Sequence, residues 1–168
     1  MRTTERRSSS PFARAEARSL IKRLEIQSPD EIDLELIAAG LDAFIEKRSL
    51  EGCEGRLLRT SNRALIVVDP SAYTSKRWRF TVAHEIGHLL LHKSSCVSML
   101  CSAQDLVNYS SSGLEAEANE FAAELLMPTE LFKSRCDVTR PSMTHVRSLA
   151  ERFETSLTAT GLRFVECT

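Results

Sequence analysis

The chain has 168 residues, enough for one compact domain of ordinary size and too few for two large ones. Hydrophobic residues make up 42% and charged residues 27%, as in ordinary globular proteins, and the net charge of −1 excludes polyanion binding by bulk charge. No apolar run approaches the roughly 20 residues that span a bilayer, and no signal-peptide pattern follows the basic N-terminus. Five cysteines without a C-x-x-C pattern fit a reducing compartment, so we expect a cytoplasmic protein with no membrane partner.

The N-terminal segment is basic and rich in serine. We expect residues 1–10 to be disordered and residues 11–168 to form a single domain. Residues 1–28 contain seven arginines and lysines but three glutamates. Such a run is usually a solvated tail or helix face, and a nucleic-acid contact is the alternative. Apolar residues near helical spacing predict a helix over residues 12–26.

The middle of the chain changes from helical to extended patterns. Ser28-Pro29-Asp30 is a helix start signal, and the apolar residues that follow predict a helix that reaches Ile45. Residues 56–59 and 64–68, separated by a polar turn, predict an antiparallel hairpin and hence a small antiparallel sheet. The serine-rich residues 93–112 read as a loop with a short irregular element. Four further helices are predicted over residues 113–127, from 129, and over 141–153 and 156–163.

One short motif points to chemistry. His84 and His88 stand in the pattern H-E-x-x-H within an apolar, helical stretch. Residues four apart lie on one helix face about 6 Å apart, so both imidazoles can aim at one Zn²⁺. Zinc lowers the pKa of a water molecule to about 7, and Glu85 can take the proton as a general base. Two satisfied structural histidines are the plain alternative, but such polar groups on a buried helix are costly without a partner.

A catalytic zinc site needs three protein ligands, and the helix over residues 113–127 offers the third. Glu115 and Asn119 share one face of that helix, together with small alanines that allow close approach. We therefore expect Glu115 to complete the ligand set, in preference to Glu117, and Asn119 to hold a ligand histidine by its other ring nitrogen. His92 lies about 12 Å along the helix from His84 and cannot be the third ligand; it reads as a surface group or as a group behind the ligands.

The segments FTVAHEIGHLLLH and EAEANEFAAELLMP resemble the ImmA/IrrE metallopeptidases, over residues about 55–165. This resemblance implies a compact, gluzincin-like α+β domain with His84, His88 and Glu115 on zinc and Glu85 as the base. It also implies cleavage of helix-turn-helix repressors, which derepresses genes of mobile elements, phage defence or the DNA-damage response. Residues 140–168 resemble the helix-turn-helix-like end of the family; packing against the metal helices is the alternative to DNA reading.

Two cysteines lie in the loop between the two ligand helices. Cys96 or Cys101 could bind the zinc as a thiolate and keep the enzyme latent, and an ordinary free thiol is the alternative. We favour Cys101, because the apolar Val97, Met99 and Leu100 before it could anchor the loop.

The sequence therefore predicts a zinc-dependent endopeptidase. A second donor to the oxyanion is expected, and Tyr73, Tyr109 and His145 are the candidates. Two other functions remain open. In one, the zinc is structural and the chain regulates by binding a repressor; in the other, the basic N-terminus and the C-terminal helices bind DNA. A weak, salt-dependent affinity for single-stranded DNA would mark nucleic acid as an activator.

Overall fold

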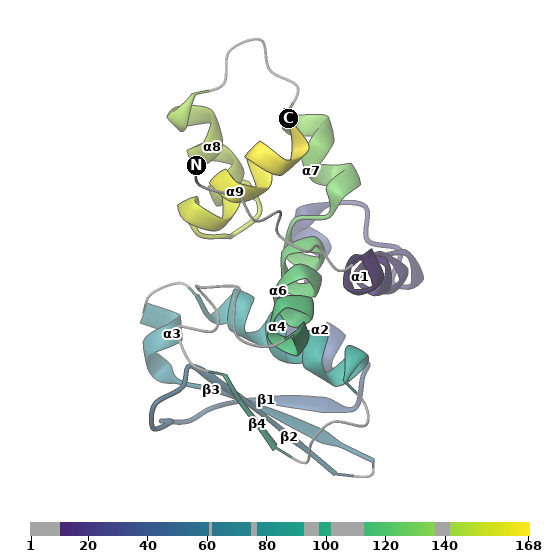
Figure 1. The fold of residues 1–168 in the computed structure, drawn as a ribbon, viewed down its shortest axis with the longest axis vertical. Helices are drawn as coiled ribbons and strands as arrows, with labels where there is room; N and C mark the ends of the chain where they lie inside the picture. Colours follow the sequence, from purple (N-terminus) through teal and green to yellow (C-terminus); the bar gives the residue numbers. More distant parts are fainter. Residues whose placement is uncertain (1–10, 61, 75–76, 93–97, 102–112, 137–141) are drawn as a thin grey trace, which may run out of the picture.

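The computed structural model describes residues 11–60, 62–74, 77–92, 98–101, 113–136 and 142–168. It has an α+β fold in which a sheet forms one end of the molecule, α4 and α6 cross its middle, and α7 to α9 form the other end (Figure 1). The expected disorder of residues 1–10 lies outside the described residues. None of the described helices combines the length and the apolar character needed to cross a bilayer.

The helices are α1 (Pro11–Arg23), a short 3-10 turn (Pro29–Glu31), α2 (Leu34–Ala39), α3 (Pro70–Thr74), α4 (Trp78–Leu91), α6 (Gly113–Leu126), α7 (Thr129–Cys136), α8 (Met143–Arg152) and α9 (Leu157–Cys167). The strands are β1 (Ala43–Lys47), β2 (Gly55–Arg59), β3 (Ala64–Val68) and β4 (Ser98–Cys101). The predicted N-terminal helix and the helices expected after residue 112 are confirmed within a few residues at their ends.

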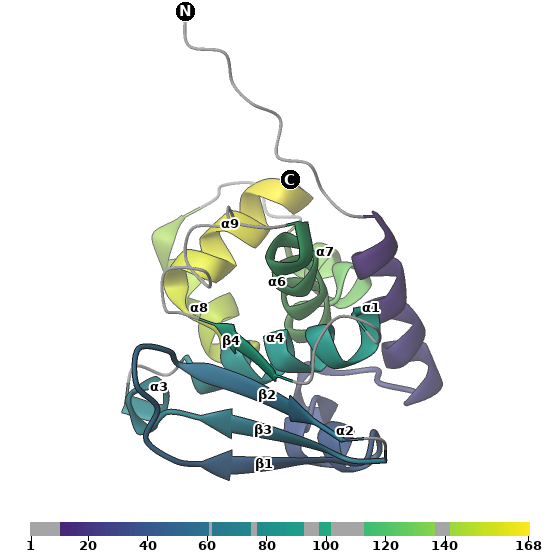
Figure 2. The ribbon, with the colours of Figure 1, turned by 60° about the horizontal axis from the view of Figure 1, so that its bottom comes forward.

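The sheet is mixed, with the strand order β1-β3-β2-β4 (Figure 2). The predicted hairpin is confirmed: β2 pairs antiparallel with β3, with Leu57 opposite Ile66. The expectation of a purely antiparallel sheet is wrong, because β1 lies parallel to β3 on the other side, with Ile45 also opposite Ile66. β4 is antiparallel to β2 and is the outermost of the described strands on that side. It lies inside the segment that the sequence predicts to be a loop.

The helix predicted to reach Ile45 stops much earlier. Asp33 caps α2 by accepting hydrogen bonds from the backbone N–H groups of Glu35 and Leu36. Asp42 then takes a positive φ of 54°, which no α-helix allows, and turns the chain into β1. Phe44 and Ile45 continue the apolar spacing, but long-range pairing with β3 determines their conformation.

α4 occupies the centre of the molecule, between the sheet and α6. Val82, Ala83 and Ile86 are fully buried in one hydrophobic cluster with strand residues of β3 and with α6. Gly87 faces α6 so closely that a Cβ atom there would lie 3.2 Å from the Cα atom of Ala118. The absence of a side chain on α4 and the small side chain on α6 therefore let the two helices approach each other closely.

The C-terminal helices form a second hydrophobic cluster of their own. Phe132 of α7 and Phe153, which follows α8, pack in a tilted arrangement with ring centroids 5.0 Å apart, and Phe164 of α9 belongs to the same cluster. Met127, at the end of α6, belongs to the same cluster. α8 and α9 thus pack on the chain that leaves α6.

A buried ion cluster connects these parts. Glu124 of α6 pairs with Arg163 of α9 and with Arg18 of α1, and it accepts hydrogen bonds from the backbone and hydroxyl of Thr129. Arg163 is 2% exposed and also donates to the backbone carbonyl of Met127. Burial raises the pKa of Glu124, but Arg163, Arg18 and Thr129 together outweigh burial and lower it below the usual value. The cluster holds a charged carboxylate in the interior.

Part of the basic N-terminal segment is also used inside the molecule. Besides the Arg18 pair, Arg14 contacts Glu120 of α6 and lies 3.2 Å from Glu166 of α9. These arginines are therefore committed to holding α1 on α6.

Glu124→Gln should lower the free energy of unfolding by about 3 kcal/mol, because the buried Arg163 loses its buried counter-charge and keeps the ion pair with the partly exposed Glu166. Denaturant unfolding measures this loss. Because the folded-state pKa of Glu124 is depressed, the stabilisation is complete above its usual pKa of 4.5 and is lost as the pH falls through the folded-state value. The difference between wild type and variant should therefore shrink in acid.

Glu166→Gln is the matched control. Glu166 also pairs with Arg163, at 3.3 Å, but its side chain is 38% exposed. We expect a loss below about 1 kcal/mol for such a pair. Equal losses of unfolding free energy in Glu124→Gln and Glu166→Gln would show that burial does not determine how much each ion pair stabilises the fold.

Candidate metal centre

Three side chains from two helices converge at the contact between α4 and α6. His84 and His88 lie one turn apart on α4 and are almost fully buried. Glu115 lies in the first turn of α6. The Nε2 atoms of the two histidines are 2.9 Å apart, and the Glu115 carboxylate oxygens lie 3.1 Å from His84 Nε2 and 3.3 Å from His88 Nε2. The expected ligand set is therefore brought together.

The donor set fits a metal ion. Ligand atoms of the three residues all lie within 4.8 Å of one another. Tetrahedral zinc, with bonds of about 2.0–2.1 Å to nitrogen, separates its ligand atoms by roughly 3.3 Å, close to the distances seen here. The two imidazole nitrogens and one carboxylate are donors that Zn²⁺ prefers.

The Glu115 carboxyl is held in its charged form. Burial alone would raise its pKa, but hydrogen bonds and electrostatic interactions with His84 and His88 outweigh burial and hold the pKa of Glu115 well below its usual value. Its position in the first turn of α6 favours the same form, since the helix dipole stabilises negative charge there. The residue thus offers an ionised oxygen to a cation.

Asn119 lies where the sequence places it, one turn after Glu115 on α6. Its Oδ1 atom is 3.0 Å from His84 Nδ1. When Nε2 of His84 binds a metal, its proton lies on Nδ1, which then donates to Asn119 Oδ1.

His92 is buried behind His88, with 6% of its surface exposed. The surface position that we allowed for it is therefore wrong. Its Nδ1 atom lies 2.9 Å from His88 Nδ1, and its Nε2 atom lies 3.1 Å from Glu117 Oε2. Burial is the largest influence on the pKa of His92 and lowers it, although Glu117 acts in the opposite direction. Sequence reasoning missed the pairing of Glu117 with His92; the i, i+4 spacing from His88 was the available signal.

Glu85 follows His84 directly on α4, and its side chain reaches β2. It is fully buried, and its carboxylate lies against β2 at Gly55. A Cβ atom on Gly55 would be 2.7 Å from Glu85 Oε1 and 2.6 Å from Thr81 Cγ2. Gly55 thus leaves the space that the Glu85 carboxylate occupies.

The other predicted site residues either have different partners in the structure or lie outside its described part. Cys96 and Tyr109 lie outside the described residues. Cys101 ends β4 directly opposite Gly55, but only its backbone is described. Tyr73 of α3 stacks on Trp78, with ring centroids 5.4 Å apart. His145 of α8 lies 2.9 Å, through Nε2, from the backbone oxygen of Arg135.

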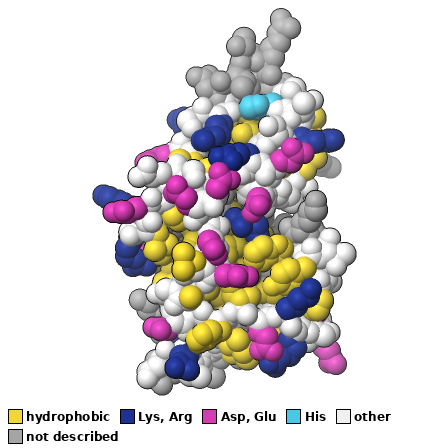
Figure 3. Space-filling view, turned by 180° about the vertical axis from the view of Figure 1, so that it is seen from behind, with side chains coloured by type: hydrophobic (Ala, Val, Ile, Leu, Met, Phe, Trp, Pro, Cys, Tyr) yellow, Lys and Arg dark blue, Asp and Glu magenta, His cyan; other side chains and the backbone are white. Residues whose placement is uncertain are grey.

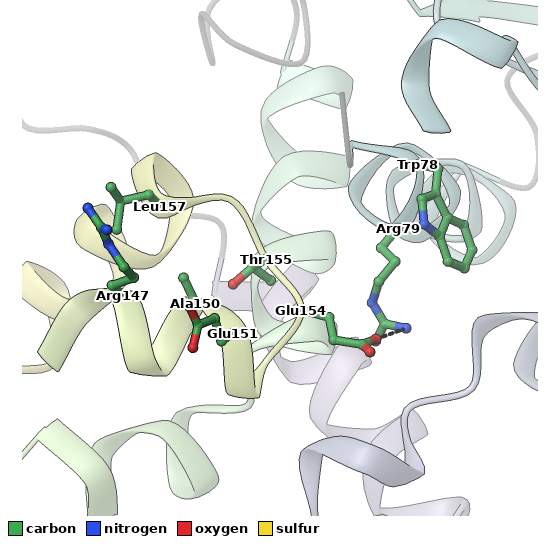
Figure 4. Close-up of a pocket in the computed structure, with 8 residues that line it drawn as sticks. All are labelled: Trp78, Arg79, Arg147, Ala150, Glu151, Glu154, Thr155 and Leu157. Atoms are coloured by element: carbon green, nitrogen blue, oxygen red, sulfur yellow. Dashed lines mark ion pairs between the residues drawn. The ribbon is translucent and has the colours of Figure 1, made fainter. Parts of the chain in front are cut away.

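A separate pocket of about 540 Å³ opens beside the first turn of α4 (Figure 4). It is lined by Trp78, Arg79, Arg147, Ala150, Glu151, Glu154, Thr155 and Leu157. Arg79 and Glu154 form an ion pair of 3.0 Å across it. The helix that carries His84 and His88 therefore shares a surface hollow with the C-terminal helices.

The comparison with known families agrees with this geometry. The model of the Peptidase_M78 family, described as the IrrE N-terminal-like domain, matches residues 38–164 and so covers α4, α6 and all three converging side chains. None of the curated proteins matches the chain. With a match over most of its length and a buried His-His-Glu group at its centre, the chain belongs to the ImmA/IrrE family of metallopeptidases.

Proposed function

We propose that this protein is a zinc-dependent endopeptidase in which His84, His88 and Glu115 bind the metal and Glu85 is the general base. The observation that carries the proposal is the convergence of two imidazole nitrogens and the Glu115 carboxylate, with contacts of 2.9 to 3.3 Å between them. The buried Glu85 directly follows His84 on the same helix. Membership of a metallopeptidase family supports the same reading.

The chain's own residues divide the work. Asn119 holds His84 in the tautomer that leaves Nε2 free to coordinate. When bound, zinc polarises a carbonyl and lowers the pKa of a water molecule to about 7. Glu85 would act as the general base, taking a proton from the attacking water and later delivering it to the leaving amine. Burial strengthens the electrostatic interactions in this step, because the local dielectric is low.

The sheet offers a way to align a substrate. Among the described strands, β4 pairs with β2 alone and ends the sheet. Such an edge can receive an extended peptide as an additional strand, which would position a backbone amide by main-chain hydrogen bonds. We therefore expect the enzyme to cleave an extended or locally unfolded segment of a protein.

We propose a helix-turn-helix repressor as the substrate, on the basis of family membership. Derepression of stress, phage-defence or mobile-element genes, activation by single-stranded DNA and a cytoplasmic location stay predictions. The free thiols of Cys53, Cys136 and Cys167 support a reducing location. On the face that Figure 3 shows, basic side chains are interspersed with acidic ones, a distribution that does not favour direct DNA binding there.

Glu85→Gln and Glu115→Gln together test the function. The protein is incubated with the repressor encoded beside its gene, and the products are identified by mass spectrometry. Glu85→Gln should bind zinc normally but cleave roughly 10²–10⁴-fold more slowly, because it cannot accept a proton. Glu115→Gln should lose the metal, and a chelator should stop the wild type until zinc is restored.

Unimpaired cleavage by Glu85→Gln would contradict the proposal. Regulation of the repressor that persists in Glu85→Gln without cleavage would instead support the alternative, a non-proteolytic regulator that contains zinc.

Gly55→Ala should slow cleavage by roughly a hundredfold, because the new methyl group occupies the place of the Glu85 carboxylate and displaces it. Zinc content should stay unchanged, since the atoms nearest the new methyl group belong to Thr81 and Glu85 and not to a metal ligand. Gly161→Ala is the control, because a Cβ atom there meets nothing within 4 Å. If Gly55→Ala cleaved at the wild-type rate, the close contact of Glu85 with β2 would have no part in catalysis.

Cys101→Ser should raise basal cleavage if Cys101 occupies a coordination position in a latent enzyme. The register of β4, which sets Cys101 opposite Gly55, supports this hypothesis. Cleavage is compared with and without a thiol-modifying reagent, with Cys53→Ser as the control. An unchanged basal rate in Cys101→Ser would exclude the latch.

A further inference from the structure

His88 is connected to the surface by two further side chains. His88 Nδ1 lies 2.9 Å from His92 Nδ1, and His92 Nε2 lies 3.1 Å from Glu117 Oε2. We propose that His92 and Glu117 form a hydrogen-bonded relay that positions His88 and thereby sets the metal affinity of the site. This inference rests on the proposed function of His88 as a ligand.

Each neutral imidazole carries one proton, and this fixes which group donates each hydrogen bond of the relay. A metal takes the lone pair of His88 Nε2, so His88 carries its proton on Nδ1 and must donate it. The acceptor is His92 Nδ1, which therefore has no proton of its own. His92 then carries its proton on Nε2 and donates it to the Glu117 carboxylate. The negative charge at the end makes both imidazoles stronger hydrogen-bond partners and His88 a more basic ligand.

The two ligand histidines are thus supported in different ways. His84 donates to the neutral amide of Asn119, whereas His88 reaches a carboxylate through a second imidazole. Glu117 is two residues from both Glu115 and Asn119 on α6 and cannot share their face. It acts on the site through His92, which caps the C-terminal end of α4 one turn beyond His88.

Hydrogen bonds hold the C-terminal end of α4, and with it His92, in place. The backbone N–H of His92 donates to the His88 carbonyl at 3.1 Å and continues the helical pattern. Arg59 of β2 donates to the carbonyl oxygens of Leu89 and His92. Since His92 is buried while the Glu117 side chain is 33% exposed, the relay runs from the interior to the edge of the molecule.

Zinc affinity, measured by competition with a chromophoric chelator, tests the relay directly. His92→Phe keeps a ring but removes the acceptor, and its zinc dissociation constant should rise roughly 10–100-fold. His92→Asn should restore part of the affinity, because the amide oxygen can accept the proton of His88 Nδ1. The visible absorption of bound Co²⁺ should change in His92→Phe and return toward wild type in His92→Asn.

Glu117→Ala should weaken zinc binding less than His92→Phe does, and it should have no further effect in a His92→Asn background. Glu120→Gln is the control on the same helix: it loses the pair with Arg14 and should change stability without changing zinc affinity. Unfolding of the metal-free variants shows whether a loss of affinity is only a loss of fold.

Wild-type zinc affinity in His92→Phe would overturn the relay, and so would a full effect of Glu117→Ala in the His92→Asn background. Failure of the wild-type protein itself to bind zinc would overturn the proposed function instead.

Discussion

The close contact between α4 and α6 is the constraint on which the rest of the molecule depends. It exists because Gly87 has no side chain where Ala118 approaches it. A larger residue at either position would push apart the two helices that carry His84, His88 and Glu115. The buried site is therefore a direct result of backbone packing.

The side chains of α4 face different neighbours around the helix. His84 and His88 face α6, while Glu85, beside His84 in the chain, faces β2 across the gap that Gly55 leaves. The helix also ends at a third histidine that reaches α6 through Glu117. One helix thus places His84 and His88 against α6, Glu85 against β2 and His92 against Glu117.

Much of the site could be predicted from the sequence, because its geometry is local to helices. The spacing of His84, His88, Glu115 and Asn119 follows from helical periodicity alone. β1 could not be predicted in the same way: Phe44 and Ile45 look helical by spacing, and only the parallel contact with β3, distant in sequence, makes them a strand. The pairing of His92 with Glu117 depends likewise on the distance between α4 and α6, which a local sequence pattern does not predict.

The shared ion cluster has a consequence for the boundaries of any shortened protein. α6 carries Glu115 near its beginning and Glu124 near its end, and Glu124 depends on Arg163 from the last helix. A fragment that stopped after α8 would lose Arg163 and leave the Glu124 carboxylate with Arg18, whose side chain is 54% exposed, as its remaining described ion-pair partner. The C-terminal helices are therefore part of the packing of α6, the helix that carries Glu115, and not a separable accessory part.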